Sequence, residues 1–233
     1  LMIVENLGDG ILERRISRIK EEAALQTAYP GPDGFQLSPQ TVYALSHQRA
    51  ATVKAREIWV VGGAFARDRL FLDPLLQDGP LRGWRIDKTH CAKAAFDIKA
   101  ATAALKNSLN DKQPEFIVIV PEMSQSDDAQ TLQTIRTDLS ALFAVATASG
   151  AIVIPTTLPL RTDDGISQSA HALDLFIRDS ATQLNLPYVS VMTLLQPTDD
   201  NKKTWTGKRV SADGYAAVNA AAGKLFLILS HFV

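Results

Sequence analysis

The segment from Glu57 to Asp68, EIWVVGGAFARD, constrains the fold more than any other part of the chain. It joins a short run of β-branched and aromatic residues to a Gly-Gly turn and then to the start of a predicted helix. An apolar strand that ends in glycine and feeds a helix is typical of a buried parallel strand in an α/β protein, where sites form at this turn. The segment therefore predicts an α/β fold with its site, if it has one, at the carboxyl end of this strand.

The alternation of strand and helix continues to the end of the chain. Further strands are predicted at about 82–87, 115–120, 151–155 and 188–191. Helices are predicted at about 65–76, 92–109, 127–149 and 167–184, and from Ser211 onward. Strands separated by helices of this length require right-handed crossovers and a mostly parallel sheet that is covered on both faces. The pattern predicts a three-layer α/β/α sandwich of about five strands.

Residues 1–56 are predicted to form a helical extension in front of the α/β domain, which spans 57–233. An amphipathic helix is expected over about 9–27, and Ser38 is expected to cap a second helix that runs to about Ala55. The apolar face of the first helix consists of Leu12, Ile16, Ile19 and Ala23. These helices are expected either to pack as an arm on the main domain or to bind a protein partner.

The composition is that of an ordinary soluble globular protein. A net charge of -1 and a hydrophobic content of 46% offer no strong field for nucleic acid or an anionic membrane. No run is expected to cross a membrane, and no signal peptide is expected at Leu1. Cys91 is the only cysteine, which excludes an internal disulfide and a thiolate zinc cage, and the four histidines lack metal-ligand spacing. Neither a metal nor a cofactor is expected.

Four short blocks stand in order along the predicted domain: VVGGAFARD, GWRIDKTHCAKAAFD, FIVIVPEMS and TGKRVSADGY. Their order and spacing, more than their letters, resemble the SGNH, or GDSL-type, hydrolase superfamily from about Glu57 to the C-terminus. The resemblance implies a flavodoxin-like α/β/α fold. In active members it also implies ester cleavage by Ser and His, with an oxyanion hole completed by Gly and Asn, and it favours an extracytoplasmic location.

The first three blocks depart from the family pattern. The nucleophile position falls on Ala64, and a methyl group cannot attack a carbonyl. The oxyanion glycine falls near Ala92, whose backbone N–H is still a donor. The oxyanion asparagine falls on Met123, and a thioether has no N–H to donate.

The last block keeps its Gly-Tyr but loses the base. Thr206 stands for the acid and Arg209 for the histidine, and a guanidinium stays protonated at neutral pH. Because a catalytic triad acts as a unit, the combined losses predict a non-catalytic domain with a structural or binding role. The alternative is an esterase or acyl-transfer enzyme with relocated residues, with Ser124 or Ser126 as nucleophile and His90 or His171 as base.

Several charged and aromatic residues are candidates for ligand binding at the same edge of the predicted sheet. They are Arg67, Glu122, Trp205, Lys208 and Arg209. Converging cations would bind an anion or an acidic carbohydrate, and Trp205 would offer a platform. The competing interpretation is solvated surface charge or a salt bridge to Asp68 or Glu122. The residues leave the partner, the oligomeric state and the compartment open.

Overall fold

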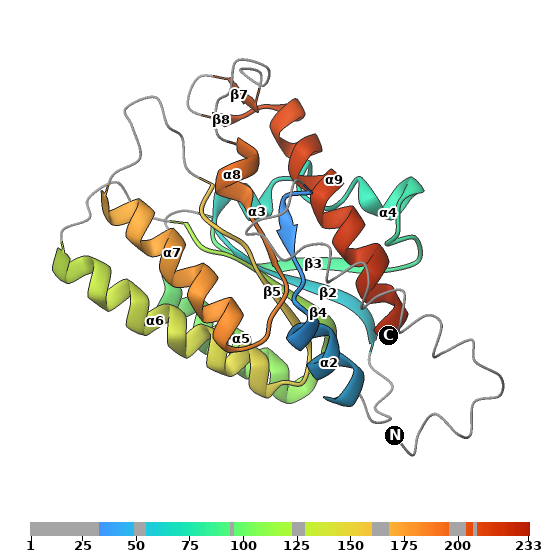
Figure 1. The fold of residues 1–233 in the computed structure, drawn as a ribbon, viewed down its shortest axis with the longest axis horizontal. Helices are drawn as coiled ribbons and strands as arrows, with labels where there is room; N and C mark the ends of the chain where they lie inside the picture. Colours follow the sequence, from blue (N-terminus) through green and yellow to red (C-terminus); the bar gives the residue numbers. More distant parts are fainter. Residues whose placement is uncertain are drawn as a thin grey trace.

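A parallel β-sheet lies at the centre of the molecule. The structure is a computed structural model that describes residues 33–48, 55–93, 96–122, 129–159, 168–195, 204–206 and 209–233. Its main sheet has the strand order β3-β2-β4-β5 (Figure 1). The strands are β2 (Ala55–Gly62), β3 (Arg85–Cys91), β4 (Pro114–Val120) and β5 (Ile152–Pro155). All neighbouring pairs in this sheet run parallel, as the sequence predicts.

A fifth strand extends the sheet beyond β5. Strand β6 (Tyr188–Val189) meets the end of β5 through a parallel bridge between Thr156 and Val189. Its other edge pairs antiparallel with β1 (Phe35–Gln36). The main sheet therefore has four strands where about five are predicted, and the fifth, β6, is much shorter than the expected 188–191 and joins the edge through that single bridge.

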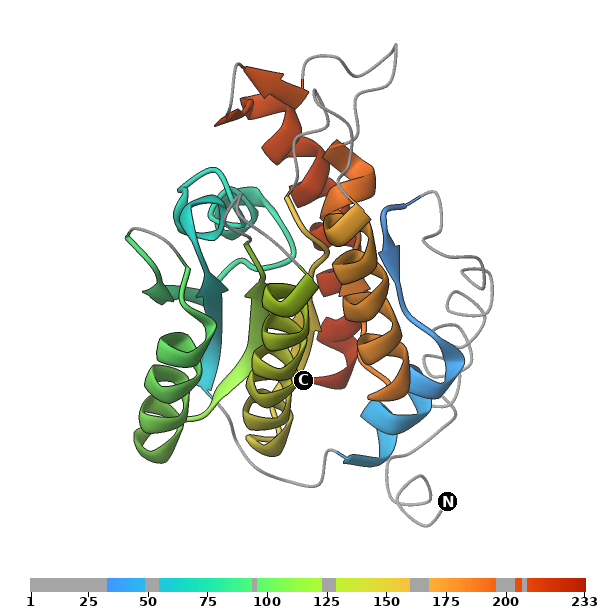
Figure 2. The same cartoon turned by 90° about the vertical axis from the view of Figure 1, so that its left-hand side faces the viewer.

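Helices cover both faces of the sheet (Figures 1 and 2). One face carries α5 (Ile98–Asp111), α6 (Ala129–Ala148) and α7 (Gln168–Gln183). The other face carries α3 (Ala64–Arg67), α8 (Val191–Leu195) and α9 (Ala212–Leu229). The remaining elements are α2 (Pro39–Gln48), α4 (Leu75–Asp78), β7 (Trp205–Thr206), β8 (Arg209–Val210) and the 3-10 turn Ser230–Phe232. The three-layer α/β/α sandwich is confirmed.

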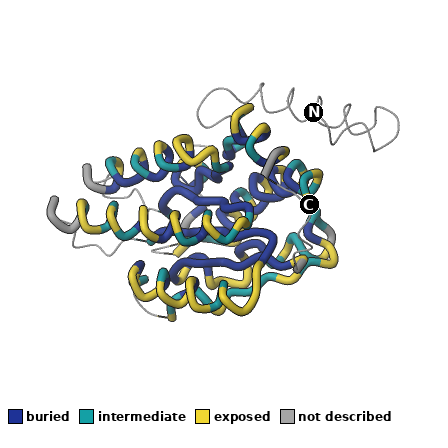
Figure 3. The backbone as a smooth tube through the Cα atoms, turned by 90° about the horizontal axis from the view of Figure 1, so that it is seen from below, coloured by how far each residue is buried: buried dark blue, intermediate teal, exposed yellow. Residues whose placement is uncertain are grey.

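The two cores follow from the alternation of side chains along β2 and β4. Trp59, Val61, Ile117 and Ile119 face α5, α6 and α7. Their neighbours Ile58, Val60, Phe116 and Val118 face α3, α8 and α9. Because both faces are covered, the strands read as continuous apolar runs, and they form the buried centre seen in Figure 3.

Several predicted boundaries are wrong. The helix expected at 65–76 is divided into α3 and α4, which are separated by the loop 68–74. The strand expected at 82–87 begins at Arg85 and runs to Cys91, and α5 begins six residues later than expected. Asp97 sets that start, since its side chain accepts the N–H of Ala100. By contrast, Ser211 caps α9 as predicted, by accepting the N–H of Gly214 at 3.1 Å.

The region before residue 57 is not entirely helical. The expected helix over 9–27 lies outside the described residues. Ser38 does cap α2, since it accepts the N–H of Thr41 at 3.0 Å, but α2 ends at Gln48 and β2 already begins at Ala55. Strand β1 was not predicted, because a two-residue strand is specified by its partner β6 and not by its own sequence. The division of the chain at residue 57 stays a prediction.

Helix α9 is long and strongly apolar. By length and mean hydropathy alone, Ala212–Phe232 is long and apolar enough to cross a membrane, although 44% of its apolar window is buried inside the domain. The expectation that no run crosses a membrane stays a prediction. The helix packs one side against the sheet.

Candidate functional site

The site region lies where the chain changes direction in the sheet. From β2 the chain crosses to β3 on one side, and β4 then returns to the other side of β2. Ligands of open α/β sheets bind outside the carboxyl ends of the strands at such a reversal. In this protein, the reversal brings the start of α3 at Ala64 next to Glu122, two residues beyond the end of β4.

The carboxylate of Glu122 binds the first turn of α3. Its Oε2 accepts the backbone N–H of Ala64 at 3.1 Å, and its Oε1 accepts that of Phe65 at 2.8 Å. A Cβ at Gly63 would collide with this carboxylate, so the close approach requires glycine there. Glu122 therefore occupies the backbone donors at the predicted nucleophile position.

The surroundings of Glu122 are partly apolar. Burial raises the pKa of Glu122, and the hydrogen bonds from the backbone of Phe65 and Ala64, which favour the ionised form, do not fully offset that effect. The ring of Tyr215 stacks on Phe65 with 4.8 Å between the centroids. Burial, together with Asp68 and Glu122, raises the pKa of Tyr215 above its ordinary value. Tyr215 therefore stays protonated at neutral pH and joins the start of α9 to the start of α3.

Ala92 also lies beside the end of β2. Its backbone N–H donates to the carbonyl of Gly62 at 2.8 Å, so it continues the ladder between β2 and β3. The preceding residue, Cys91, is buried and donates its thiol to the carbonyl of Val60 at 3.3 Å. Burial raises the pKa of Cys91 to about 12, so the thiol is not a nucleophile at neutral pH.

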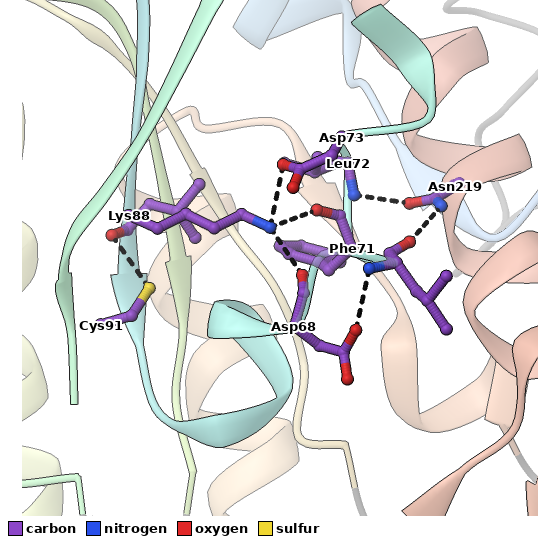
Figure 4. A network of polar contacts seen from close by, with 9 residues as sticks. Asp68, Phe71, Leu72, Asp73, Lys88, Cys91 and Asn219 are labelled. Atoms are coloured by element: carbon purple, nitrogen blue, oxygen red, sulfur yellow. Dashed lines mark hydrogen bonds and ion pairs between the residues drawn. The ribbon is translucent and has the colours of Figure 1, made fainter. Parts of the chain in front are cut away.

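Lys88 holds the loop 68–74 that follows α3 (Figure 4). Its Nζ donates to the carbonyls of Asp68 and Phe71 at 2.6 and 2.7 Å, and it pairs with the Asp73 carboxylate at 3.0 Å. One ammonium group on β3 thus satisfies three oxygens of the loop. This is why the chain leaves the helical conformation after Arg67, although its spacing predicts a continuous helix.

Asn219 holds the same loop from α9 (Figure 4). Its Nδ2 donates to the carbonyl of Leu70 at 2.6 Å, and its Oδ1 accepts the N–H of Leu72 at 2.9 Å. Leu72 has a φ of 64°, a conformation that costs energy for leucine and that these contacts maintain. The loop is thus bound on one side by β3 and on the other by α9.

The residues of the last sequence block form a separate hairpin. Strands β7 and β8 pair antiparallel, with Thr206 opposite Arg209, and both side chains are exposed. The hairpin lies at the same end of the sheet as α3 in Figures 1 and 2. Met123, Lys208 and the side chain of Trp205 lie outside the described residues. The structure therefore brings Ala64, Ala92 and Glu122 together, and it places Thr206 and Arg209 in a second group.

Arg67 is exposed at the end of α3. Its charge lowers the pKa of Cys91 against the larger effect of burial, which raises it. The predicted convergence of Arg67 with Lys208 and Arg209 stays a prediction.

The alternative catalytic residues are only partly described. Ser124 and Ser126 lie outside the described residues. His90 packs against Trp59, with 5.2 Å between the ring centroids, on the face of the sheet opposite α3. His171 is exposed on α7, close to Asp174, which is buried and pairs with Arg178 at 2.8 Å. Among the described residues, neither histidine lies at the turn that carries Ala64.

Sequence reasoning missed the role of Glu122 and the two residues that hold the loop. The role of Glu122 follows from the adjacency of β2 and β4, which sequence order alone does not give. Asn219 did carry a signal, because it is a polar residue on the buried side of an otherwise apolar helix. Such a residue must find a hydrogen-bond partner inside the protein.

Comparison of the coordinates with solved structures identifies the fold. A member of the lipolytic G-D-S-L family from Veillonella parvula aligns with a TM-score of 0.59 and 12% identity, over 73% of this chain and 97% of that chain. A psychrotrophic esterase from a Pseudoalteromonas species aligns with a TM-score of 0.52 and 13% identity, over 72% of this chain and 94% of that chain. A GDSL-like lipase from Bacteroides thetaiotaomicron aligns with a TM-score of 0.53 and 13% identity, over 91% of this chain and 96% of that chain. The chain therefore has the fold of the SGNH, or GDSL-type, hydrolases.

The sequence comparisons add nothing to this assignment. No family model and no curated protein matches the sequence. At identities of this size the likeness establishes the fold, and the chemistry has to be inferred from the site.

Proposed function

We propose that this domain is a non-catalytic module with the SGNH fold, which serves a structural or binding role within a larger assembly. The observation that carries the proposal is the Glu122 carboxylate on the backbone N–H groups of Ala64 and Phe65. Ester hydrolysis develops a negative oxyanion beside the nucleophile, where backbone donors must receive it. A carboxylate on those donors repels the oxyanion, and Ala64 offers no nucleophile.

Two other residues support the same proposal. The Ala92 amide, at the position of the oxyanion glycine, is already used by the carbonyl of Gly62. Arg209, at the position of the base, carries a guanidinium, which has hydrogen-bond donors but no acceptor for a proton. Nucleophile, base and oxyanion donors are thus all replaced or occupied by the chain itself.

The proposed binding surface lies outside the turn that Glu122 fills. Glu122 disfavours an anion at the start of α3, because the bound anion would face a like charge. Arg67 and the hairpin that carries Trp205 and Arg209 are left as the proposed contacts for a carbohydrate or an anionic group.

The proposal is tested by ester hydrolysis and by labelling. The purified protein is incubated with short-chain aryl esters, and separately with a serine-directed phosphonate followed by mass spectrometry. We expect no turnover above the blank and no adduct. The double variant Ala64→Ser, Arg209→His is measured in parallel, with and without Glu122→Gly. We expect labelling of residue 64 only where Glu122 is removed.

The same experiment would reveal the competing function. A stoichiometric phosphonate adduct on a serine of the wild-type chain, with turnover that the adduct abolishes, would overturn the non-catalytic proposal. Ser124 and Ser126 are the serines to inspect first, since they follow β4 in the sequence. The protein would then be an esterase or acyl-transfer enzyme with a relocated nucleophile.

A further inference from the structure

Helix α9 exposes an apolar face on the outside of the domain. Its inner side is buried against the sheet and α3 through Tyr215, Val218, Leu225 and other core residues. Its outer face consists of the exposed residues Ala216, Ala220, Lys224 and Leu227, with the partly exposed Ala217 and Ile228 beside them. Leu227 alone is 58% exposed. Lys224 is the only charged residue between Gly214 and Leu229, so α9 is apolar on both sides.

A helix that is apolar all round is normally covered all round. The inner side of α9 has its cover, whereas the outer face has none among the described residues. Exposed alanines four residues apart let another helix approach closely, and Leu227 offers a side chain that a partner helix can bury. The outer face of α9 is therefore a surface on which another segment can pack.

The described chain begins on this same face. Asp33, the first described residue, forms an ion pair with Lys224. The next residues, Phe35 and Leu37, are buried in the core cluster that includes the inner side of α9. The described part of the chain therefore begins at the outer face of α9.

The sequence of the residues that precede Asp33 fits the face. The segment 9–27 has the periodicity of an amphipathic helix, with Leu12, Ile16, Ile19 and Ala23 on one side. A helix of that length is about 28 Å long, close to the roughly 27 Å of α9. The linking residues 28–32 span at most about 17 Å, and their prolines and glycine end the helix and let the chain turn.

We propose that the segment 9–27 packs as an amphipathic helix on the outer face of α9. This contact would make the N-terminal extension an integral cover of the domain, held in place by the ion pair of Asp33 with Lys224. The inference is independent of whether the domain is catalytic, since it concerns the face of α9 that points away from the sheet.

Hydrogen exchange with mass spectrometry on the full chain tests the proposal. Peptides from 9–27 are expected to exchange at least ten-fold more slowly than an unfolded chain. In the double variant Ala220→Glu, Leu227→Glu this protection is expected to disappear, while peptides from β2 and β4 keep theirs and so report an intact domain. The matched control is Leu175→Glu on α7, where the leucine is 41% exposed, and it should leave 9–27 protected.

Either of two exchange results would overturn the proposal. In the first, residues 9–27 of the wild type exchange at the rate of an unfolded chain. In the second, they are protected equally in the wild type and in the double variant, so that they pack elsewhere. The molar mass in solution is measured on the same samples. A dimer that dissociates only in the double variant would assign the face to a second copy of the chain and also reject the proposal.

Discussion

Two glutamates at opposite ends of the sheet lie in very different surroundings. Glu57 lies near the amino end of β2, where Lys112 and Arg85 approach its Oε1 at 2.6 and 3.1 Å and the Trp59 indole N–H donates at 3.1 Å. Glu122 lies beyond the carboxyl end of β4 and is bound by backbone N–H groups. Cations surround the carboxylate of Glu57, whereas backbone N–H groups at the start of α3 bind that of Glu122.

The pKa values follow this difference. Burial would raise the pKa of Glu57, but the hydrogen bonds from Lys112 and Trp59 and the charges of Lys112 and Arg85 together lower it. At Glu122 burial prevails over the backbone hydrogen bonds and raises the pKa. The comparison indicates that Glu57 contributes to the stability of the fold, whereas in the proposed function Glu122 occupies a place where a hydrolase would bind a reacting group.

The largest effect is expected from Glu57→Ala. The substitution removes a buried acceptor from two cations and an indole, and we expect the free energy of unfolding to fall by about 2 to 3 kcal/mol. The estimate is at the low end for a buried pair because Arg85 and Lys112 remain solvated. Urea unfolding measures it. A loss below about 0.5 kcal/mol would mean that Glu57 does not stabilise the fold, and the contrast with Glu122 would fail.

At the carboxyl end, the largest effect is expected from Asn219→Ala. The carbonyl of Leu70 and the N–H of Leu72 would lose their partner, at a cost of about 2 kcal/mol. Hydrogen exchange should show the loss of protection in the loop 68–74 while β5 is unchanged. Equal protection in the variant and the wild type would mean that Lys88 alone holds the loop.

A smaller effect is expected from Glu122→Ala. Water can reach the donors at the start of α3, since the Ala64 end of this contact is exposed, so we expect a loss of at most about 1 kcal/mol. The variant is compared with Glu57→Ala under the same conditions. If the two substitutions cost the same, Glu122 is a structural residue like Glu57 and the distinction fails.

The smallest effects are the opposite pH dependences of the two sites. The folded-state pKa of Glu57 is lowered. Its contribution to the free energy of unfolding is therefore present above the unfolded-state pKa and is lost as the pH falls through the folded-state pKa. The folded-state pKa of Glu122 is raised. Its contribution to the free energy of unfolding is therefore present below the unfolded-state pKa and is lost as the pH rises through the folded-state pKa.

Unfolding free energies of Glu57→Gln, Glu122→Gln and the wild type at about pH 7 and about pH 4 test these signs. When the pH is lowered, the unfolding free energy of the wild type should fall relative to that of Glu57→Gln and rise relative to that of Glu122→Gln. A change of the same sign for both variants would contradict the assignment.

The sequence predicts the elements whose structure depends on their own residues. Strands β2, β4 and β5 are found where expected because both of their faces are buried and their apolar runs are uninterrupted. Strand β3 is displaced from its predicted place, since it lies at the edge of the main sheet and carries charges at Arg85, Asp87 and Lys88. Its sequence therefore lacks the apolar run by which a central strand is recognised.

The failures arise where tertiary contacts decide the conformation. The residues 65–76 have helical spacing, yet Lys88 and Asn219 hold the middle of this segment as a loop. At the site, the position of Ala64 follows from the strand-turn-helix pattern. The hydrogen bonds of Glu122 do not, because they depend on which strand lies next to β2.

The central claim is that the Glu122 carboxylate occupies the donors at the start of α3. The most direct test is a pH titration of the backbone amides of Ala64 and Phe65 by nuclear magnetic resonance, in the wild type and in Glu122→Gln. We predict that both amides shift together with one midpoint above the ordinary glutamate pKa, and that the transition is absent in the variant. Amides that do not titrate, or that titrate unchanged in Glu122→Gln, would show that these donors are free for an oxyanion and contradict the account.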